Sequence, residues 1–247
     1  MLSGDDSLQC STWSVLSEVK DKKVFVFGSG SVDEEYIAAS GWTLAPIEEA
    51  NLIVARGTFT ICNGQTTVSK NEDADQYWQV LEESLEVAAS RRVPMLVTNP
   101  DKVRPDKGFP PMPGAIGDAY QARLDKSASG TNESIPEASS PDGLIQRIGK
   151  PFPEVYQLAL SGTEGKRACM VGDALETDVT GGSQNRITTV WVTDDGIHGP
   201  AVEEGSGSEG DLQDGAKAVL ESFNERDGTY ANGQQLCPTI VLPHFRW

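Results

Sequence analysis

The chain has 247 residues, of which 38% are hydrophobic, and a formal net charge of −17. A chain of this length buries a substantial core, in one large domain or two small ones. The negative charge repels nucleic acid and anionic membrane surfaces, so we expect neither as a partner. Much of the polar excess lies near residues 125–143 and 204–215. The longer stretch has no periodicity and predicts a disordered acidic insertion in the surface.

The cysteines and the absence of export signals bear on the compartment. Four cysteines lie far apart and form no C-x-x-C pair, which is typical of a reducing compartment. The first ten residues lack the basic and apolar regions of a signal peptide, and no apolar run is long enough to span a membrane. We therefore expect a cytoplasmic location and leave an organelle open. Cys169 lies within an apolar run, where a buried side chain is expected.

The first half of the chain alternates short apolar runs with amphipathic segments. We expect helices at 12–22, 33–40 and 73–90, and buried strands at 24–27, 52–55 and 93–97. This alternation predicts crossover connections and a largely parallel sheet, which is an α/β fold.

The second half resumes the same alternation after a loop rich in Pro and Gly, expected at residues 104–120. Here we expect strands at 168–171, 188–192 and 239–242, with helices at 153–160 and about 211–225. The helix at 153–160 begins with Pro, a residue favoured in the first turn.

A pair of carboxylates follows the apolar run at 168–171. Asp173 comes at the carboxyl end of that strand, and Asp178 stands five residues later. Open α/β sheets bind their ligands at this edge, and two carboxylates suit one hard divalent cation such as Mg²⁺. A purely structural interpretation makes Asp173 a helix N-cap and Asp178 a first-turn residue that complements the helix dipole. This segment alone leaves the two interpretations evenly balanced.

Two other polar sites lie at expected strand or helix ends. Lys150, between Gly149 and Pro151, is restrained in a way that suits holding a phosphate, although a lone loop lysine is more often solvated. Asn99 and Asp101 follow the third strand. Locally they favour a turn that closes the strand, and a substrate-binding polar cluster is the alternative.

One glycine-rich turn is similar to a dinucleotide-binding fingerprint. Gly28-Ser29-Gly30 follows the first strand, but Asp33 stands where the third glycine should be. An acidic side chain there would face a pyrophosphate, so no nucleotide site is predicted.

Three motifs in order are more specific than any one of them: Thr98-Asn99-Pro100-Asp101, Gly149-Lys150-Pro151 and the run from Gly172 to Asp178. Together they resemble the haloacid dehalogenase (HAD) superfamily, subclass IIA, over roughly residues 23–200. That subclass includes sugar-phosphate, nitrophenyl-phosphate and pyridoxal-phosphate phosphatases. The resemblance implies an incomplete HAD-like Rossmannoid three-layer core with an inserted α/β cap. It assigns 1–22 to an N-terminal remnant, 23–98 to the cap and 99–247 to the core.

The resemblance also implies a chemistry. Such enzymes are Mg²⁺-dependent phosphohydrolases, which here would act on a small phosphate ester through an aspartyl-phosphate. Lys150 would steady the nucleophile and the phosphate. Asp173 would ligate Mg²⁺ directly, and Asp178 would belong to the metal site as an outer-shell partner. Asn99 and Asp101 would contact substrate, and a homodimer formed through the cap is an expected assembly.

One motif of the resemblance has no counterpart. The family's nucleophile lies in a D-x-D-G sequence that ends an apolar strand before the cap, whereas here Asp5 and Asp6 are adjacent and follow no such strand. Adjacent side chains in an extended segment point in opposite directions. The resemblance therefore implies a truncated or degenerate copy, in which the strand at 168–171 has an unpaired edge. The alternative is a catalytically silent pseudophosphatase that binds a phospho-ligand or a protein partner.

Overall fold

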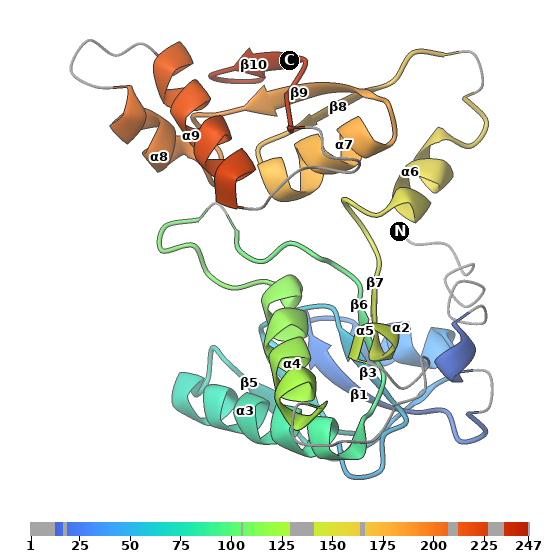
Figure 1. Cartoon of the computed structure of the whole chain (residues 1–247). Helices are drawn as coiled ribbons and strands as arrows, with labels where there is room; N and C mark the ends of the chain where they lie inside the picture. The colour runs from blue at the N-terminus through green and yellow to red at the C-terminus, as the bar shows by residue number, and fades with distance from the viewer. Residues whose placement is uncertain are drawn as a thin grey trace. The chain divides into compact units, whose positions relative to one another are not determined.

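A computed structural model describes residues 13–16, 19–104, 106–128, 141–163, 166–206, 212–226 and 235–246. The chain divides into two compact units, which Figure 1 shows with their elements labelled. The first comprises Met1–Lys102 and Pro111–Ile148, and the second comprises Val103–Pro110 and Gly149–Trp247. The first unit thus extends well beyond the boundary expected at residue 98. No helix in the described part of the chain is long and apolar enough to cross a membrane.

The first unit contains a mixed sheet in the order β5-β4-β1-β3-β6-β7, with β2 also paired to β1. Its strands are β1 (Lys23–Gly28), β2 (Thr43–Leu44), β3 (Leu52–Ala55), β4 (Thr60–Cys62), β5 (Thr67–Ser69), β6 (Met95–Val97) and β7 (Ile145–Arg147). From β1 through β3 and β6 to β7 the pairing is parallel, while β4 and β5 pair antiparallel. The expectation of a largely parallel α/β sheet is met in this part.

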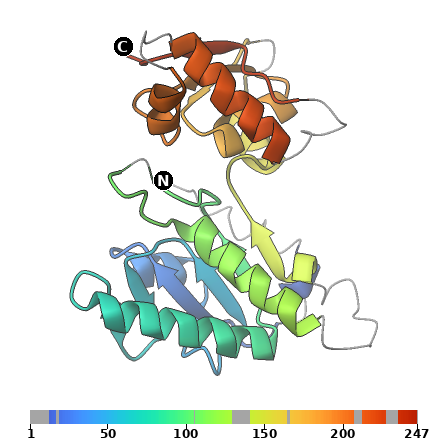
Figure 2. The ribbon, with the colours of Figure 1, turned by 60° about the vertical axis from the view of Figure 1, so that its left-hand side comes forward.

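Helices cover both faces of this sheet, because side chains along β1 alternate between two apolar clusters. Phe25 and Phe27 face α3 (Ala74–Arg91) and α4 (Pro113–Ala128), which lie side by side in Figure 2. Val24 and Val26 belong to the opposite cluster, which includes Ile37 of α2 (Asp33–Ala39). The 3-10 turn η1 (Ser14–Leu16) also packs there, and it is the only helical turn that the described residues form within the expected helix 12–22.

Helix α4 corrects two sequence expectations. Its apolar side chains Ile116, Tyr120 and Leu124 are buried against α3 and the sheet, so a segment expected to be loop is a helix of 16 residues. The bounds predicted for the disordered insertion, 125–143, are also too wide at both ends. Residues 125–128 belong to α4 and 141–143 belong to α5 (Pro141–Leu144), whereas 129–140 lie outside the described residues.

The second unit contains a smaller parallel sheet in the order β10-β9-β8. Its strands are β8 (Cys169–Gly172), β9 (Thr188–Val192) and β10 (Ile240–Leu242). The helices are α6 (Pro153–Leu160), a π-helix η3 (Leu175–Val179), α7 (Thr180–Gln184), α8 (Gly199–Gly205) and α9 (Leu212–Arg226). A separate core cluster joins η3, β9, α8 and α9 around the fully buried Trp191.

Strand β8 has a strand neighbour on one side only within the described ranges, namely β9. Three of its residues are half-buried, and Cys169 is exposed. The expectation that Cys169 is buried is therefore wrong: it belongs to an apolar run, but the described residues do not cover it. An unpaired parallel strand with partly exposed apolar side chains is unusual in α/β proteins, whose parallel strands are normally covered on both faces.

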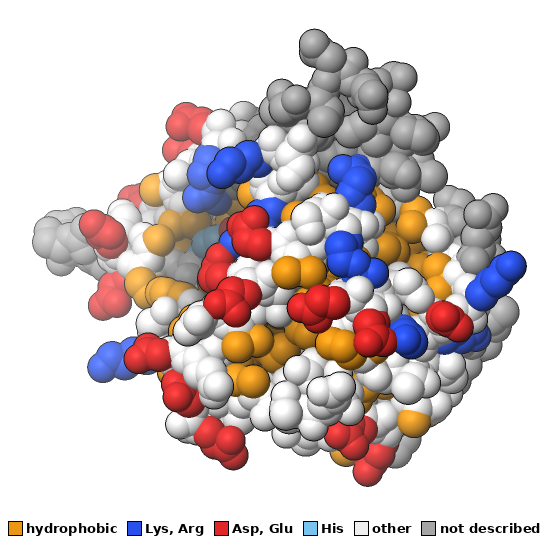
Figure 3. All heavy atoms as spheres, turned by 90° about the horizontal axis from the view of Figure 1, so that it is seen from below, with side chains coloured by type: hydrophobic (Ala, Val, Ile, Leu, Met, Phe, Trp, Pro, Cys, Tyr) orange, Lys and Arg blue, Asp and Glu red, His pale blue; other side chains and the backbone are white. Residues whose placement is uncertain are grey.

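Surface charge is mixed where the described residues show it. Figure 3 shows acidic side chains spread over one face of the molecule, with Lys and Arg between them. Among the described residues, Asp118 contacts two basic side chains, Lys102 at 2.8 Å and Arg147 at 2.9 Å. The negative charge of this face is thus distributed over a solvated surface.

Candidate phosphate and metal site at the end of β8

An ion pair between Lys150 and Asp178 joins the loop before α6 to η3. Lys150 Nζ lies 2.6 Å from Asp178 Oδ1, and Asp178 is only 3% exposed. The other carboxylate oxygen accepts hydrogen bonds from the backbone N–H groups of Asp173 and Ala174, each at 3.1 Å. Gly172 leaves space for this arrangement, because a Cβ there would lie 2.1 Å from Asp178 Cγ. Oδ1 of Asp178 therefore holds Lys150, and Oδ2 holds the loop after β8.

Asp173 stands at the carboxyl end of β8 and is held from the loop after β9. Its Oδ2 accepts from Ile197 N–H at 3.0 Å, and its carbonyl oxygen accepts from the Trp191 indole N–H at 3.0 Å. A Cβ on Gly196 would lie 2.4 Å from Asp173 Cβ, so the loop packs directly on this side chain. Among the described residues no donor contacts Oδ1. That oxygen is the atom on which a cation could bind.

The metal-binding capacity of these residues is partial. In the described part of the chain, no group of three or more His, Cys, Asp or Glu side chains is arranged to hold a metal ion. Asp173 fits a hard cation through one oxygen, and the engaged oxygens of Asp178 fit an outer role. Further ligands would be water, substrate oxygens or groups beyond the described residues.

Glu176 and His198 form a second polar pair beside Asp173. His198 Nε2 lies 3.0 Å from Glu176 Oε2, and Arg226 approaches the same carboxylate at 4.0 Å. Burial raises the pKa of Glu176, but the hydrogen bond and charge of His198, with help from its own backbone N–H and from Arg226, outweigh this. The pKa of Glu176 therefore lies below its usual value.

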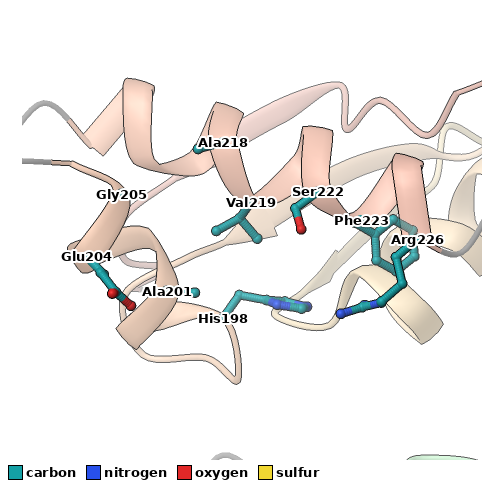
Figure 4. A pocket seen from close by; sticks show the side chains of 9 residues that line it. All are labelled: His198, Ala201, Glu204, Gly205, Ala218, Val219, Ser222, Phe223 and Arg226. Carbon is teal, nitrogen blue, oxygen red and sulfur yellow. The ribbon is translucent and has the colours of Figure 1, made fainter.

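A groove of about 330 Å³ opens next to this pair, between α8 and α9. In Figure 4 the side chains of His198 and Arg226 point toward one another at one end, and Val219 and Ser222 reach into the space from α9. The helices approach closely at the other end, where a Cβ on Gly205 would lie 3.2 Å from Gly215 Cα. His198 is thus reachable from solvent through the groove, although its side chain is only 14% exposed.

The residues Asn99 and Asp101 lie in the first unit, after β6. Asn99 Oδ1 accepts a hydrogen bond from Asp101 N–H at 3.0 Å, which is an Asx turn. Asp101 O in turn accepts from Gly114 N–H at the start of α4, at 3.0 Å. This is the strand-closing turn favoured from the sequence, and it does not by itself speak for or against a contact with substrate.

The glycine-rich turn after β1 holds an internal anion. Asp33 Oδ1 accepts from Ser29 N–H at 3.1 Å and from Arg56 Nη1 at 2.8 Å, and Oδ2 accepts from Gly30 N–H at 3.2 Å. The Asp33 carboxylate thus takes the place in which a nucleotide-binding loop receives a phosphate.

Sequence reasoning missed the partners of Asp173. Glu176 stands at a position that the motif leaves open, and Ile197 contributes its backbone N–H, for which side-chain patterns carry no signal. Trp191 had a signal in the apolar strand 188–192, but nothing indicated that its indole would bond to Asp173.

Comparisons with known proteins bear on the family and the fold. Residues 147–225 match the HAD-hydrolase-like family. A p-nitrophenyl phosphatase from Archaeoglobus fulgidus is similar in structure, with a TM-score of 0.50, 19% identity and coverage of 97% of this chain and 69% of that one. For a 4-nitrophenylphosphatase from Thermotoga maritima the TM-score is 0.51 and the identity 19%, with coverage of 97% of this chain and 67% of that one. For a "possible sugar phosphatase, HAD superfamily" from Cytophaga hutchinsonii the TM-score is 0.56 and the identity 18%, with coverage of 95% of this chain and 68% of that one. A comparison with curated protein sequences finds no match.

The α/β fold is that of the HAD-type phosphatases, which are phosphatase-type hydrolases. Residues 147–225 thus resemble HAD-type hydrolases in sequence, and the fold expected from the three motifs is confirmed.

Proposed function

We propose that this chain is the metal-binding and lysine-bearing part of a Mg²⁺-dependent phosphohydrolase that acts on a small phosphate ester. The observation that carries the proposal is the contact of Lys150 with Asp178 directly behind Asp173, at the carboxyl end of β8. In this arrangement a fixed ammonium group and a carboxylate with one unengaged oxygen lie at the carboxyl end of the same strand, β8. A phosphate group needs both of these, a positive charge and a cation held by a carboxylate.

Each residue has a distinct part in this proposal. Asp173 would bind Mg²⁺ through Oδ1, while Asp178 keeps the loop and the lysine in place. A bound Mg²⁺ would offset the negative charge of the phosphate group. Lys150 would orient a phosphate oxygen, and Asn99 and Asp101 would contact the remainder of the substrate. The attacking carboxylate would come from a strand that pairs with the outer edge of β8, which the described residues leave unpaired.

A Mg²⁺ titration of the full chain tests the metal site. Wild type is expected to bind Mg²⁺ and to melt at a higher temperature in its presence, whereas Asp173→Asn should lose both effects. Asp195→Asn is the matched control, because this residue lies in the same loop region, is 69% exposed and pairs with His244. Equal Mg²⁺ binding by wild type and Asp173→Asn would exclude Asp173 as the ligand.

A silent pseudophosphatase is the second candidate. It is favoured by the small number of metal ligands, since the described residues contain no group of three that could hold an ion. Hydrolysis of p-nitrophenyl phosphate with Mg²⁺ separates the two candidates. Turnover that Asp173→Asn abolishes supports the enzyme, and Mg²⁺ binding without turnover supports a binding protein. We also propose a homodimer through the cap expected at 23–98, and light scattering of the eluted protein would test for a dimer.

A further inference from the structure

We propose that His198 is a positioning residue for Asp173: it ties the loop after β9 to the first turn of η3, and so fixes the two groups that donate to Asp173, one to its carboxylate and one to its backbone carbonyl. The inference rests on the proposed function, because it assumes that the geometry of Asp173 matters for binding a cation. The chain has two histidines, and only His198 lies at this site.

The ring of His198 is bound to η3. Its Nε2 lies 3.0 Å from Glu176 Oε2 and 3.4 Å from Leu175 N. The Glu176 carboxylate can only accept, so the shorter contact requires a proton on Nε2, which the ring then donates. This hydrogen bond attaches the ring to the turn that begins two residues after Asp173.

The backbone of His198 transmits this tie to the Asp173 carboxylate. His198 is the N-cap residue of α8, and its carbonyl accepts from Val202 N–H at 3.0 Å. The residue before it, Ile197, donates its N–H to Asp173 Oδ2 at 3.0 Å. Because α8 fixes His198 on one side and η3 fixes its ring on the other, Ile197 N–H has little freedom to move away from Asp173.

A second path runs through Trp191. The His198 ring meets the Trp191 ring edge-on, with centroids 5.9 Å apart and an interplanar angle of 77°. Trp191 is fully buried, and its indole N–H donates to the Asp173 carbonyl at 3.0 Å. Loss of the imidazole would leave a space beside the indole. That would loosen the hydrogen bond that fixes the Asp173 backbone.

The experiment compares His198→Ala, His198→Gln and wild type as full-length proteins. His198→Ala should weaken Mg²⁺ binding by about 10- to 100-fold, the range seen when partners behind metal ligands are removed. His198→Gln should retain most of the affinity, because its amide can replace Nε2 as donor or acceptor. Added imidazole should partly restore His198→Ala, since the groove between α8 and α9 gives it access. His244→Ala, which removes the other histidine, is the control and should bind as wild type does.

A second measurement needs no metal. Hydrogen exchange of the Trp191 indole N–H, assigned with Trp191→Phe, should accelerate in His198→Ala and slow again with imidazole. If wild type binds Mg²⁺ and His198→Ala binds it equally well, the inference is overturned while the proposed function stands. If wild type binds no Mg²⁺, the proposed function fails, and the exchange rate decides: an unchanged rate overturns the positioning role, and a rescued acceleration supports it. If His198→Ala does not fold, His198→Gln replaces it in the test. A loss of Mg²⁺ affinity of about 10- to 100-fold in His198→Gln, the loss expected for removal of the whole ring, would then overturn the inference.

Discussion

Lys150 Nζ and Asp178 Oδ1 lie 2.6 Å apart, although 28 residues separate them in the sequence. The contact joins two motifs that the sequence presents separately. Asp178 also accepts the backbone N–H groups that follow β8, so the lysine neutralises a nearly buried carboxylate that shapes the Asp173 loop. The proposed phosphate site would thus be built on a structural ion pair between these two side chains.

Replacing Lys150 with Met should destabilise the protein. The change leaves the Asp178 carboxylate buried without its cation, which costs roughly 1–3 kcal/mol once the 38% exposure of the lysine is allowed for. Urea denaturation measures the change in the free energy of unfolding. Lys217→Met is the control, because Lys217 is 72% exposed and approaches Glu221 only at 3.9 Å, so its loss should cost less than about 0.5 kcal/mol. Equal stability of the two variants would show that the ion pair contributes nothing.

Asp33→Asn, in the first unit, should lower the free energy of unfolding more than Lys150→Met does. Asp33 is 6% exposed and accepts from Arg56, from two backbone N–H groups and from Thr60. An amide nitrogen in place of one oxygen would face these donors and leave Arg56 without its charge partner. The expected loss is about 3–5 kcal/mol, the cost of breaking a buried pair. Glu34→Gln, at the next and exposed position of α2, should change the unfolding free energy by less than about 0.5 kcal/mol. An Asp33→Asn variant as stable as this control would contradict the prediction.

The cysteines should differ in reactivity. Burial raises the pKa of the Cys62 thiol, and Cys62 is 4% exposed, whereas Cys169 and Cys237 are exposed. A short pulse of iodoacetamide on the folded protein, followed by peptide mass mapping, should label Cys169 and Cys237 but not Cys62. In denaturant Cys62 should become labelled as well. Protection of Cys169 in the folded protein would show that something covers the outer edge of β8.

Sequence patterns identified the elements that bury one clear apolar face. The strand at 52–55, the strand at 188–192 and the helix at 153–160 have the bounds that the sequence predicts. Helix α4 was missed because Pro and Gly dominate the segment before it. Yet Ile116, Tyr120 and Leu124 stand four residues apart, which is the spacing of one helix face. Strands β4 and β5 have three residues each, too few for a period to show.

The candidate site was predictable only in part, for a related reason. Asp173 and Asp178 stand out because they follow an apolar run, and Lys150 stands out because it lies between Gly149 and Pro151. What orients Asp173 is tertiary: a backbone N–H 24 residues away and an indole 18 residues away. Contacts of this kind depend on how β8 and β9 pair, and one sequence does not determine that in detail.

The Glu176–His198 pair should make stability depend on pH in a definite direction. The pKa of Glu176 in the folded protein lies below its ordinary value of 4.5, because the contacts with His198 and Arg226 outweigh its burial. A lowered pKa in the folded state means that the carboxylate stabilises the protein above about pH 4.5. This contribution is lost as the pH falls through the folded-state pKa.

Glu176→Gln should therefore be less stable than wild type near neutral pH, by less than about 1 kcal/mol because the side chain is 36% exposed. The difference should shrink toward zero in acid. Urea denaturation of both proteins between about pH 3 and about pH 6 measures it. A gap that stays constant across this range would mean that the Glu176 charge is not what stabilises the pair.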